Sequence, residues 1–472
     1  HVSAMQGLSM TRRDYQQQGV EAATAALREQ GFFILADEMG LGKSAQAIWT
    51  AQELGARILV ICPAVSKGVW HEQWEKWGDT TGDFVPMVCE GLVPDLDPED
   101  CPPPTLTICN YDILAPRKNV RKLRGGGYTT HRFPGWVDAL CAEKFDMLVL
   151  DEAHAVKNGG SARTQAVQKL CASVKYKLAL TGTPVWTELL DLWGLSQALK
   201  PWVLGTKFKF SQKYMKPYIR TWNVKGVEKG AWVYEGVNEE TLPELRERLA
   251  TFMLSRKKAD VLKELPPKQW VVVPVDTRLS YMADGQTLSE AKVDTTVAQA
   301  ELVLQQKPRV VVFAHYVNSV HEIALGLKGR AWMFTGDSTE REREDALRHW
   351  RDRGGALVMT TAAGGISLNL QEADTVIFND LEPNPGPVKQ AADRVHRLGQ
   401  LNPCTIYCVV DRNTRDGAVG ATLVRRLEAA ETVTGGSAAE LSLLSPEETL
   451  AEINQRITES YIPENEEDEL DS

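Results

Sequence analysis

Residues 37–44 read Asp37-Glu38-Met39-Gly40-Leu41-Gly42-Lys43-Ser44, between an apolar run that ends at Leu35 and a helical pattern over 45–54. Glycines at this spacing let backbone N–H groups and the start of a helix face phosphate oxygens. Lys43 would neutralise the charge of the terminal phosphates, and the Ser44 hydroxyl would ligate Mg²⁺. Asp37 stands where the strict phosphate-loop pattern has glycine, and a plain glycine turn would look similar. The strand–turn–helix context favours a phosphate loop.

Length and composition describe a folded chain of more than one domain. Its 472 residues exceed what one hydrophobic core usually organises, so we expect two or three domains. No apolar run approaches the roughly 18 residues needed to span a membrane. Lys and Arg number 53 and Asp and Glu number 63, which gives a net charge of −10. This excludes binding of nucleic acid by bulk positive charge, so a polyanion site has to be local.

Short β-branched runs alternate with longer amphipathic stretches, a pattern typical of βα units around parallel sheets. Two series of such runs occur, at 31–37, 57–62, 105–110, 145–151 and 176–181, and at 271–275, 310–315, 331–335, 356–360, 375–379 and 405–410. A segment of different composition and the pair Pro266-Pro267 separate the two series. We therefore predict an α/β fold with two tandem lobes of mostly parallel sheet and an inserted helical, aromatic-basic segment. The expected divisions are lobe 1 (1–200), the insertion and joint (201–265), lobe 2 (266–430) and a C-terminal extension (431–472).

The insertion interleaves eight aromatic residues with Lys and Arg between positions 202 and 234. Basic groups that follow phosphates and aromatic faces that stack on bases would make a nucleic-acid surface. An aromatic mini-core with solvated lysines fits the same pattern and is the interpretation we favour. A second basic run, at 117–124 before three glycines, predicts a mobile basic loop, although a solvated charged segment would look the same.

Residues 145–150 form an apolar strand that delivers Asp151-Glu152-Ala153-His154 to its carboxyl end. Open α/β sheets bind ligands at this edge. Asp151 would hold Mg²⁺, directly or through water, and Glu152 would orient and deprotonate an attacking water. The next strand ends in Thr181-Gly182-Thr183-Pro184, whose hydroxyls could sense hydrolysis. A tight turn rich in Thr, Gly and Pro is an equally good alternative there.

Residues 390–400 put Arg394 and Arg397 three positions apart, on one face of a predicted helix. Guanidinium groups brought to a γ-phosphate stabilise the charge that develops there, a contribution of ~10³ to 10⁵ in rate. The alternative is an ordinary Arg-rich surface helix paired with Asp393.

The order of these motifs, from Lys43 through Asp151, Thr181 and Gly364 to Arg397, is that of superfamily-2 helicases. Within that superfamily the chain resembles the Swi/Snf-like DNA translocases, from about residue 10 to 430. The wording of the last arginine motif and of the Asn-Pro-Gly before it is most similar to the annealing-helicase branch. The resemblance implies two RecA-like lobes that enclose ATP and Mg²⁺.

The resemblance also implies a role for each matched position. The catalytic residues would be Lys43, Asp151, Glu152, Arg394 and Arg397, with Ser44 and Asp151 holding Mg²⁺ partly through water. Nucleotide binding would fall to Gln16, which reads adenine, and to Asp37, Glu38, Met39, Gly40, Leu41, Gly42, Lys43 and Ser44. Coupling of hydrolysis to movement would use His154, Thr181, Thr183, Gly364 and Gln390. Nucleic acid would contact Pro63, Trp74, Asn110, Tyr111, Gly336, Gly365 and Asn369.

These motifs predict an ATP-dependent translocase on duplex or branched DNA, monomeric, free of membrane segments and served by a recruiting protein partner. We expect it inside the cell, in the cytoplasm or nucleoid of a bacterial or viral system or in a eukaryotic nucleus. A strand-separating DNA or RNA helicase is the alternative within the enzyme class. Outside that class, a nucleotide-gated DNA-binding scaffold would need neither Glu152 nor the two arginines, because it gains nothing from their rate enhancement.

Two further features of the sequence concern redox chemistry and the end of the chain. Eight cysteines include no CxxC pair, so we expect neither a zinc site nor a disulfide framework, and a reducing compartment fits.

Residues 464–472 contain six carboxylates and no Lys or Arg. We expect solvated, disordered charge there, with an electrostatic gate over a basic groove as the alternative.

Overall fold

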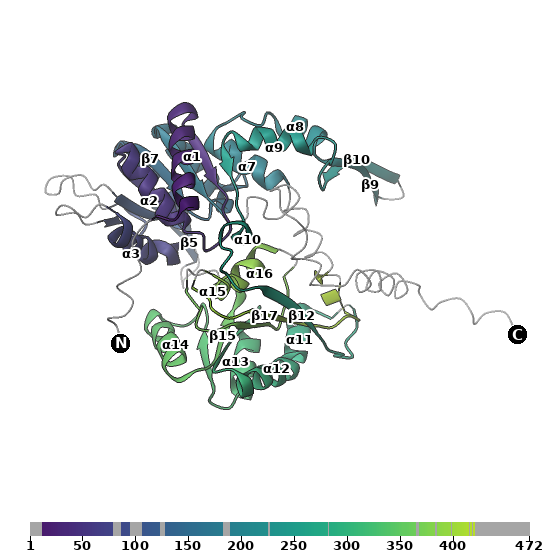
Figure 1. Cartoon of the computed structure of the whole chain (residues 1–472). Helices are drawn as coiled ribbons and strands as arrows, with labels where there is room; N and C mark the ends of the chain where they lie inside the picture. The colour runs from purple at the N-terminus through teal and green to yellow at the C-terminus, as the bar shows by residue number, and fades with distance from the viewer. Residues whose placement is uncertain are drawn as a thin grey trace, which may run out of the picture. The chain divides into compact units, whose positions relative to one another are not determined.

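The computed structural model divides the chain into two compact units, His1–Lys263 and Glu264–Ser472, whose elements Figure 1 labels along the chain. The structure describes residues 12–78, 86–94, 106–122, 128–182, 189–224, 227–281, 283–364, 368–382, 385–397, 399–414, 416–417 and 419–420. The predicted C-terminal extension, with its acidic end, lies outside the described residues.

A parallel sheet with the strand order β11-β1-β8-β7-β2-β4-β3 forms the centre of the first unit. The strands are β1 (Phe32–Leu35), β2 (Ile58–Cys62), β3 (Met87–Val88), β4 (Leu106–Asn110), β7 (Met147–Leu150), β8 (Tyr176–Leu180) and β11 (Met253–Leu254). The central strands are almost entirely buried, as expected for a parallel sheet covered on both faces. Because all its strands run the same way, every loop that leaves a carboxyl end reaches one edge of the sheet.

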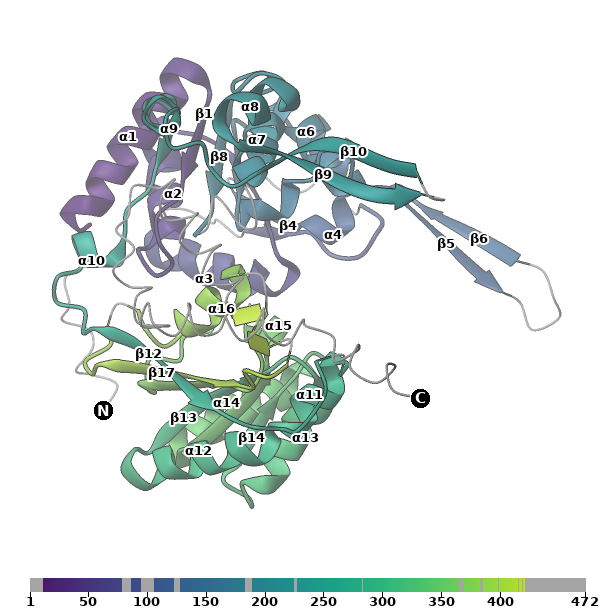
Figure 2. The ribbon, with the colours of Figure 1, turned by 90° about the vertical axis from the view of Figure 1, so that its right-hand side faces the viewer.

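Helices and two antiparallel hairpins complete the first unit. The helices are α1 (Asp14–Gln30), α2 (Lys43–Leu54), α3 (Lys67–Trp77), α4 (Tyr111–Leu114), α5 (Val137–Ala142), α6 (Ala162–Ser173), α7 (Leu189–Leu199), α8 (Lys207–Tyr214), α9 (Leu242–Ala250) and α10 (Lys258–Val261). The hairpins pair β5 (Arg117–Lys122) with β6 (Tyr128–Phe133), and β9 (Lys216–Val224) with β10 (Val227–Glu235). Figure 2 shows both hairpins projecting away from the sheet and its helices.

The second unit has its own parallel sheet, with the strand order β12-β17-β16-β13-β15-β14. Its strands are β12 (Lys268–Pro274), β13 (Arg309–Ala314), β14 (Ala331–Phe334), β15 (Gly355–Thr360), β16 (Thr375–Phe378) and β17 (Cys404–Val410). Its helices are α11 (Gly285–Ala291), α12 (Val293–Gln306), α13 (Val317–Gly326), α14 (Glu340–Arg353), α15 (Thr361–Gly364) and α16 (Pro385–Ala392). Two separate clusters of buried apolar side chains cover the sheet.

The predicted α/β fold with two parallel-sheet lobes is confirmed, and each predicted strand range contains a strand. The basic run at 117–124 that we predicted as a loop instead forms strand β5, which pairs with β6 and lacks the apolar alternation of a half-buried strand. The insertion is only partly helical, because β9 and β10 occupy its middle. Its predicted mini-core holds for Phe210 and Tyr214, each 1% exposed, but Phe208 and Trp232 are both 64% exposed.

Candidate nucleotide site

The predicted phosphate loop connects the carboxyl end of β1 to the first residue of α2. Gly40 and Gly42 have φ angles of 86° and 77°, in the left-handed region that favours glycine. A Cβ atom on Gly42 would lie 2.5 Å from Nε2 of Gln16. Gln16 Nε2 also donates to the carbonyl of Leu41 at 3.4 Å. The residue predicted to read adenine therefore lies against the loop backbone.

Lys43 begins α2, and its ammonium turns back onto the loop. Its Nζ donates to the carbonyl oxygen of Asp37 at 2.7 Å and to that of Glu38 at 3.4 Å. Burial lowers the pKa of Lys43, and the nearby carboxylates, led by Glu152, oppose that shift. Lys43 is therefore a dehydrated cation whose donors point at oxygen atoms, which phosphate oxygens could replace.

Asp151 and Glu152 follow the carboxyl end of β7, at the same edge. Trp70 Nε1 donates to Asp151 Oδ2 at 2.8 Å, and the Glu152 N–H donates to Asp151 Oδ1 at 3.0 Å. Burial, followed by repulsion from Glu152, raises the pKa of Asp151 to about 6. The pKa of Lys43 is lowered and that of Asp151 is raised, and desolvation is the main cause of both shifts. Groups with perturbed pKa values cluster at functional sites.

The backbone at Glu152 is strained, with a φ of 46° that is unusual for a residue with a side chain. His154 Nδ1 lies 3.4 Å from Glu152 Oε2. The Tyr111 hydroxyl donates to the backbone carbonyl of Asp151 at 2.8 Å. The Tyr111 hydrogen bond therefore supports this turn, and His154 lies beside the carboxylate of Glu152.

The carboxyl end of β8 also reaches the phosphate loop. The Thr181 N–H donates to the carbonyl of Leu35 at 3.1 Å, and the Thr181 side chain is fully buried. A Cβ atom on Gly182 would lie 2.6 Å from Met39 Cγ and 3.6 Å from Lys43 Nζ. Three segments that are far apart in the sequence, after β1, β7 and β8, are therefore brought together. Thr183 lies outside the described residues.

Asp37 does not face a phosphate. Its fully buried carboxylate accepts from Arg256 Nε at 2.9 Å and from Gln46 Nε2 at 3.2 Å, and it also pairs with the Nη2 of Arg256. Arg256 further donates to the Tyr15 carbonyl and to Gln46 Oε1. The ion pair with Arg256 explains why position 37 holds aspartate where the strict phosphate-loop pattern has glycine. Sequence reasoning missed Arg256, because a buried carboxylate calls for a cation but does not say where in the chain it lies.

Replacing Arg256 by methionine is expected to lower the free energy of unfolding by about 3 kcal/mol, because Asp37 would keep a buried charge without its cation. Urea unfolding of wild type and variant measures this cost. Replacing Lys169, whose pair with Asp138 is exposed, by methionine is the control and should cost under about 1 kcal/mol. Equal costs for the two variants would contradict a structural role for the buried pair.

Asp151→Asn is expected to stabilise the nucleotide-free protein at pH 8 by about 2 kcal/mol. The pKa of Asp151 in the folded state, about 6, lies above the ordinary 3.8. At a pH below 3.8, protonation of Asp151 therefore contributes its full stabilisation of the fold. That stabilisation is lost as the pH rises through about 6. Thermal midpoints of wild type and variant should therefore differ more at pH 8 than at pH 5. A gap that does not depend on pH would exclude the raised pKa.

Three of the residues predicted to contact nucleic acid have buried side chains, and their contact with nucleic acid stays a prediction. The side chains of Trp74, Asn110 and Tyr111 are only 4%, 5% and 4% exposed. Trp74 packs in the apolar cluster of the first unit, and Tyr111 supports the turn at Asp151. Aromatic side chains after a strand suggest stacking on bases, but here burial of apolar area decides their place. Gly336 and Asn369 are exposed and Pro63 is half-buried, whereas Gly365 lies outside the described residues.

In the second unit, Arg394 and Arg397 follow the end of α16 at Ala392 and lie in irregular turns. The prediction that they share a helical face is therefore wrong. Arg394 is 7% exposed, and Arg397 Nη1 makes a long contact of 3.5 Å to the carbonyl of Leu368. Burial lowers the pKa of Arg397. Of the predicted coupling residues here, Gln390 is 9% exposed and Gly364 ends α15.

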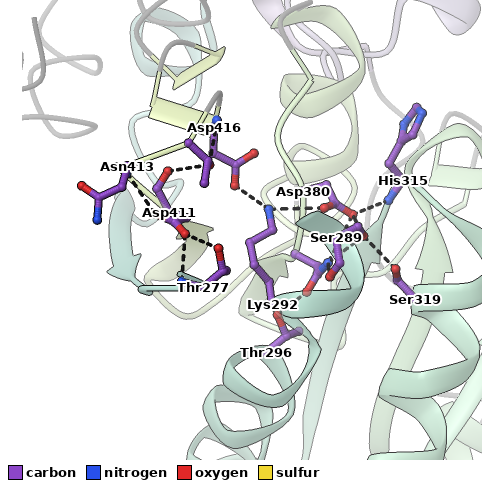
Figure 3. Close-up of polar contacts among 12 residues, drawn as sticks. Thr277, Ser289, Lys292, Thr296, His315, Ser319, Asp380, Asp411, Asn413 and Asp416 are labelled. Atoms are coloured by element: carbon purple, nitrogen blue, oxygen red, sulfur yellow. Dashed lines mark hydrogen bonds and ion pairs between the residues drawn. The ribbon is translucent and has the colours of Figure 1, made fainter. Parts of the chain in front are cut away.

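A polar cluster that sequence reasoning missed lies at the carboxyl edge of the second sheet (Figure 3). The fully buried Lys292 places its Nζ 2.6 Å from Asp416 Oδ2 and 3.3 Å from Asp380 Oδ1. Asp380 Oδ2 also accepts from the Ser289 hydroxyl at 2.7 Å and from the His315 N–H at 2.9 Å. These contacts tie the end of β16 to the start of α12 and to the segment after β17.

The described residues also bear on metal binding and on membrane crossing. Among the described residues, no group of three His, Cys, Asp or Glu side chains is placed to hold a metal. Within the same ranges, no helix combines the length and the apolar character that crossing a membrane requires.

Comparisons with known proteins match both units. The family model described as SNF2-related domain matches residues 15–283, and the helicase conserved C-terminal domain matches residues 293–399. The chain is 27% identical over 442 residues to the DNA annealing helicase and endonuclease ZRANB3 of Mus musculus. The matched region covers 85% of this chain and 39% of that protein. It is 26% identical over 439 residues to the SWI/SNF-related matrix-associated actin-dependent regulator of chromatin subfamily A-like protein 1 of Xenopus laevis, covering 85% of this chain and 42% of that protein.

A solved structure, the Sulfolobus solfataricus SWI2/SNF2 ATPase core in complex with dsDNA, matches with 20% identity and a TM-score of 0.43, covering 93% of this chain and 96% of that one. The chain spans about two fifths of the length of the two curated relatives named above. The resemblance predicted from the motifs is confirmed, and each of the two units has a parallel sheet of its own. Because the first family model alone covers more than half of the 472 residues, the chain belongs to the SNF2-related family.

Proposed function

We propose that this chain is an ATP hydrolase that couples hydrolysis to movement on, or remodelling of, duplex or branched DNA. The observation that carries the proposal is the convergence of Lys43, Asp151, Glu152 and Gly182 at one edge of a parallel sheet, with opposite pKa shifts at the lysine and the aspartate. Triphosphate hydrolysis needs this pairing of a phosphate-binding cation with carboxylates for metal and water. Curated relatives of the chain are named as an annealing helicase and a chromatin regulator.

In the first unit we assign Lys43 to the terminal phosphates and Glu152 to the attacking water, which it orients and deprotonates. The donors present fit Mg²⁺ bound together with nucleotide: the Ser44 hydroxyl is partly exposed beside Lys43, and Asp151 is a carboxylate at the same edge. When bound, Mg²⁺ supplies charge neutralisation to the phosphates. Since these two residues alone do not make a metal cage, phosphate oxygens would complete the coordination.

In the second unit we assign Arg394 and Arg397 to the charge that develops on the γ-phosphate. Arg397 suits this role because its guanidinium is partly buried, where its pKa is lowered, and its contacts are a long hydrogen bond of 3.5 Å to the carbonyl of Leu368 and the charge of Asp393. A preorganised cation in a site from which water is excluded stabilises developing charge far better than one in water. Nucleotide binding would draw the two lobes together, and hydrolysis would release them, moving one lobe along the DNA.

The test is the ATPase rate of the purified chain with duplex, branched and single-stranded DNA and with RNA. Stimulation by duplex or branched DNA supports the proposal, and stimulation by RNA alone overturns it. Displacement of a triplex-forming strand without unwinding of a forked duplex would favour translocation over strand separation. ATP binding without turnover under every condition would favour the DNA-binding scaffold.

The remaining parts of the proposal follow from duplex DNA as substrate. Affinity should come from phosphate contacts, with steep salt dependence and little sequence preference. We propose a monomeric motor that acts inside the cell, where ATP and DNA are present, and that a partner protein recruits to its substrate. Size-exclusion chromatography with light scattering tests the monomeric state.

A further inference from the structure

The hairpin of β5 and β6 is rich in basic residues. Residues 117–133 contain six Lys and Arg and no Asp or Glu, a local charge of +6 in a chain whose net charge is −10. Arg117, Lys118, His131 and Arg132 are all exposed, and none of them forms an ion pair with a carboxylate of the described residues. Within the described part of the chain, Arg117, Lys118 and Arg132 therefore present their charge on a projecting element without a carboxylate partner.

The pairing of the two strands places two of these cations next to each other, and their repulsion raises the free energy of the hairpin. Lys118 and Arg132 pair directly across the hairpin, so their side chains share a face, where like charges destabilise a strand pair. The carboxylates nearest in sequence are already used, because Asp112 pairs with Arg163 at 2.7 Å and Asp138 pairs with Lys169. A polyanion laid on the hairpin would turn this repulsion into attraction.

The root of the hairpin is firmly attached to the first unit. Gly135 has a φ of 71°, and a Cβ atom there would lie 2.4 Å from the carbonyl oxygen of Leu114. The Trp136 N–H donates to the carbonyls of Ile113 and Leu114 at 3.1 Å, and the buried indole donates to Gly91 at 3.1 Å. Since α4 directly follows β4, the hairpin leaves from the sheet edge that also carries the nucleotide site (Figure 2).

We propose that the β5–β6 hairpin binds the sugar-phosphate backbone of duplex DNA, with Lys118 and Arg132 as paired phosphate contacts. This inference rests on the proposed function and adds a DNA-binding surface outside the matched motifs. Phosphate contacts from a projecting ribbon position a protein on the duplex and carry no sequence information. A duplex fits better than a small anion, because each strand of the hairpin has six residues and extends about 20 Å.

The experiment compares Lys118→Gln/Arg132→Gln with the control Lys144→Gln/Lys175→Gln. The control removes the same charge from exposed lysines just before the amino ends of β7 and β8, at the opposite edge of the sheet. We expect the hairpin variant to need about tenfold more random-sequence duplex DNA for half-maximal ATPase stimulation at about 0.1 M salt. Its maximal rate at saturating DNA should stay within about twofold of wild type. The slope of log affinity against log salt should fall by about 1.8, since two phosphate contacts are lost.

The outcomes separate this inference from the proposed function. Equal DNA affinity and salt slope for the hairpin and control variants overturn the hairpin assignment but leave duplex-stimulated ATPase intact. No stimulation of the wild-type chain by duplex DNA overturns the proposed function itself. Loss of binding to duplex RNA with DNA binding unchanged also overturns the inference. Thermal midpoints of both variants should not fall below wild type, because the substituted side chains are exposed and the hairpin variant loses a repulsive pair.

Discussion

Lys43→Ala is expected to lower the DNA-stimulated ATPase rate by about 10³-fold, the loss that follows removal of a preorganised donor from developing charge. The Lys43 ammonium is buried beside the carboxylates of Asp151 and Glu152. Burial of that charge costs folding free energy, so its removal should not destabilise the nucleotide-free protein. Steady-state turnover and binding of a fluorescent ATP analogue measure the loss, and thermal unfolding measures the fold.

Lys177→Ala is the matched control for this prediction. Lys177 lies near the amino end of β8, and burial lowers its pKa as it does for Lys43. If the effect of Lys43→Ala came only from removing a desolvated lysine, the two variants would lose activity equally. Retention of DNA-stimulated turnover by Lys43→Ala would remove the phosphate-binding role from this residue.

Arg397→Ala is expected to retain nucleotide binding and lose hydrolysis by ~10³ to 10⁵, the range found for arginines that stabilise the phosphoryl transition state. This corresponds to roughly 4 to 7 kcal/mol of barrier. The variant should fold normally, because the hydrogen bond of the guanidinium to the Leu368 carbonyl is long, at 3.5 Å, and burial already disfavours its charge. Single-turnover hydrolysis separates the chemical step from binding, which the same fluorescent analogue measures.

Arg330→Ala provides the comparison for Arg397. Arg330 pairs with Glu301 at 3.0 Å on the exposed surface of the same unit, and its loss should leave both binding and hydrolysis unchanged. A proportional loss of binding and hydrolysis in Arg397→Ala would identify a ground-state contact. The assignment to the transition state would then fail.

Local sequence pattern was sufficient for most of the fold. Buried parallel strands read as continuous β-branched runs because both of their faces are covered, so every predicted strand range holds a strand. The hairpin of β5 and β6 was not predicted, since its strands carry basic residues instead of an apolar face. Pattern alone also extended the last arginine motif as a helix, although α16 ends at Ala392.

For the site residues, too, local features could be predicted and contacts between distant residues could not. Glycines and a lysine between a strand and a helix predicted the turn between β1 and α2, and its left-handed glycines are found there, because the backbone geometry of such a turn is local. Trp70, which donates to Asp151, and Arg256, which neutralises Asp37, lie 81 and 219 positions from their partners. No local periodicity encodes such pairs.

The amino-acid sequence was enough to predict two parallel-sheet lobes, the glycine turn between β1 and α2, and the family of the chain, because each depends on short-range periodicity and backbone conformation. Only the tertiary structure showed that Trp74 lies in the hydrophobic core and that Asp37 forms an internal ion pair with Arg256. It also showed that Lys118 lies directly opposite Arg132 in the hairpin. These outcomes depend on burial and register, which long-range packing decides.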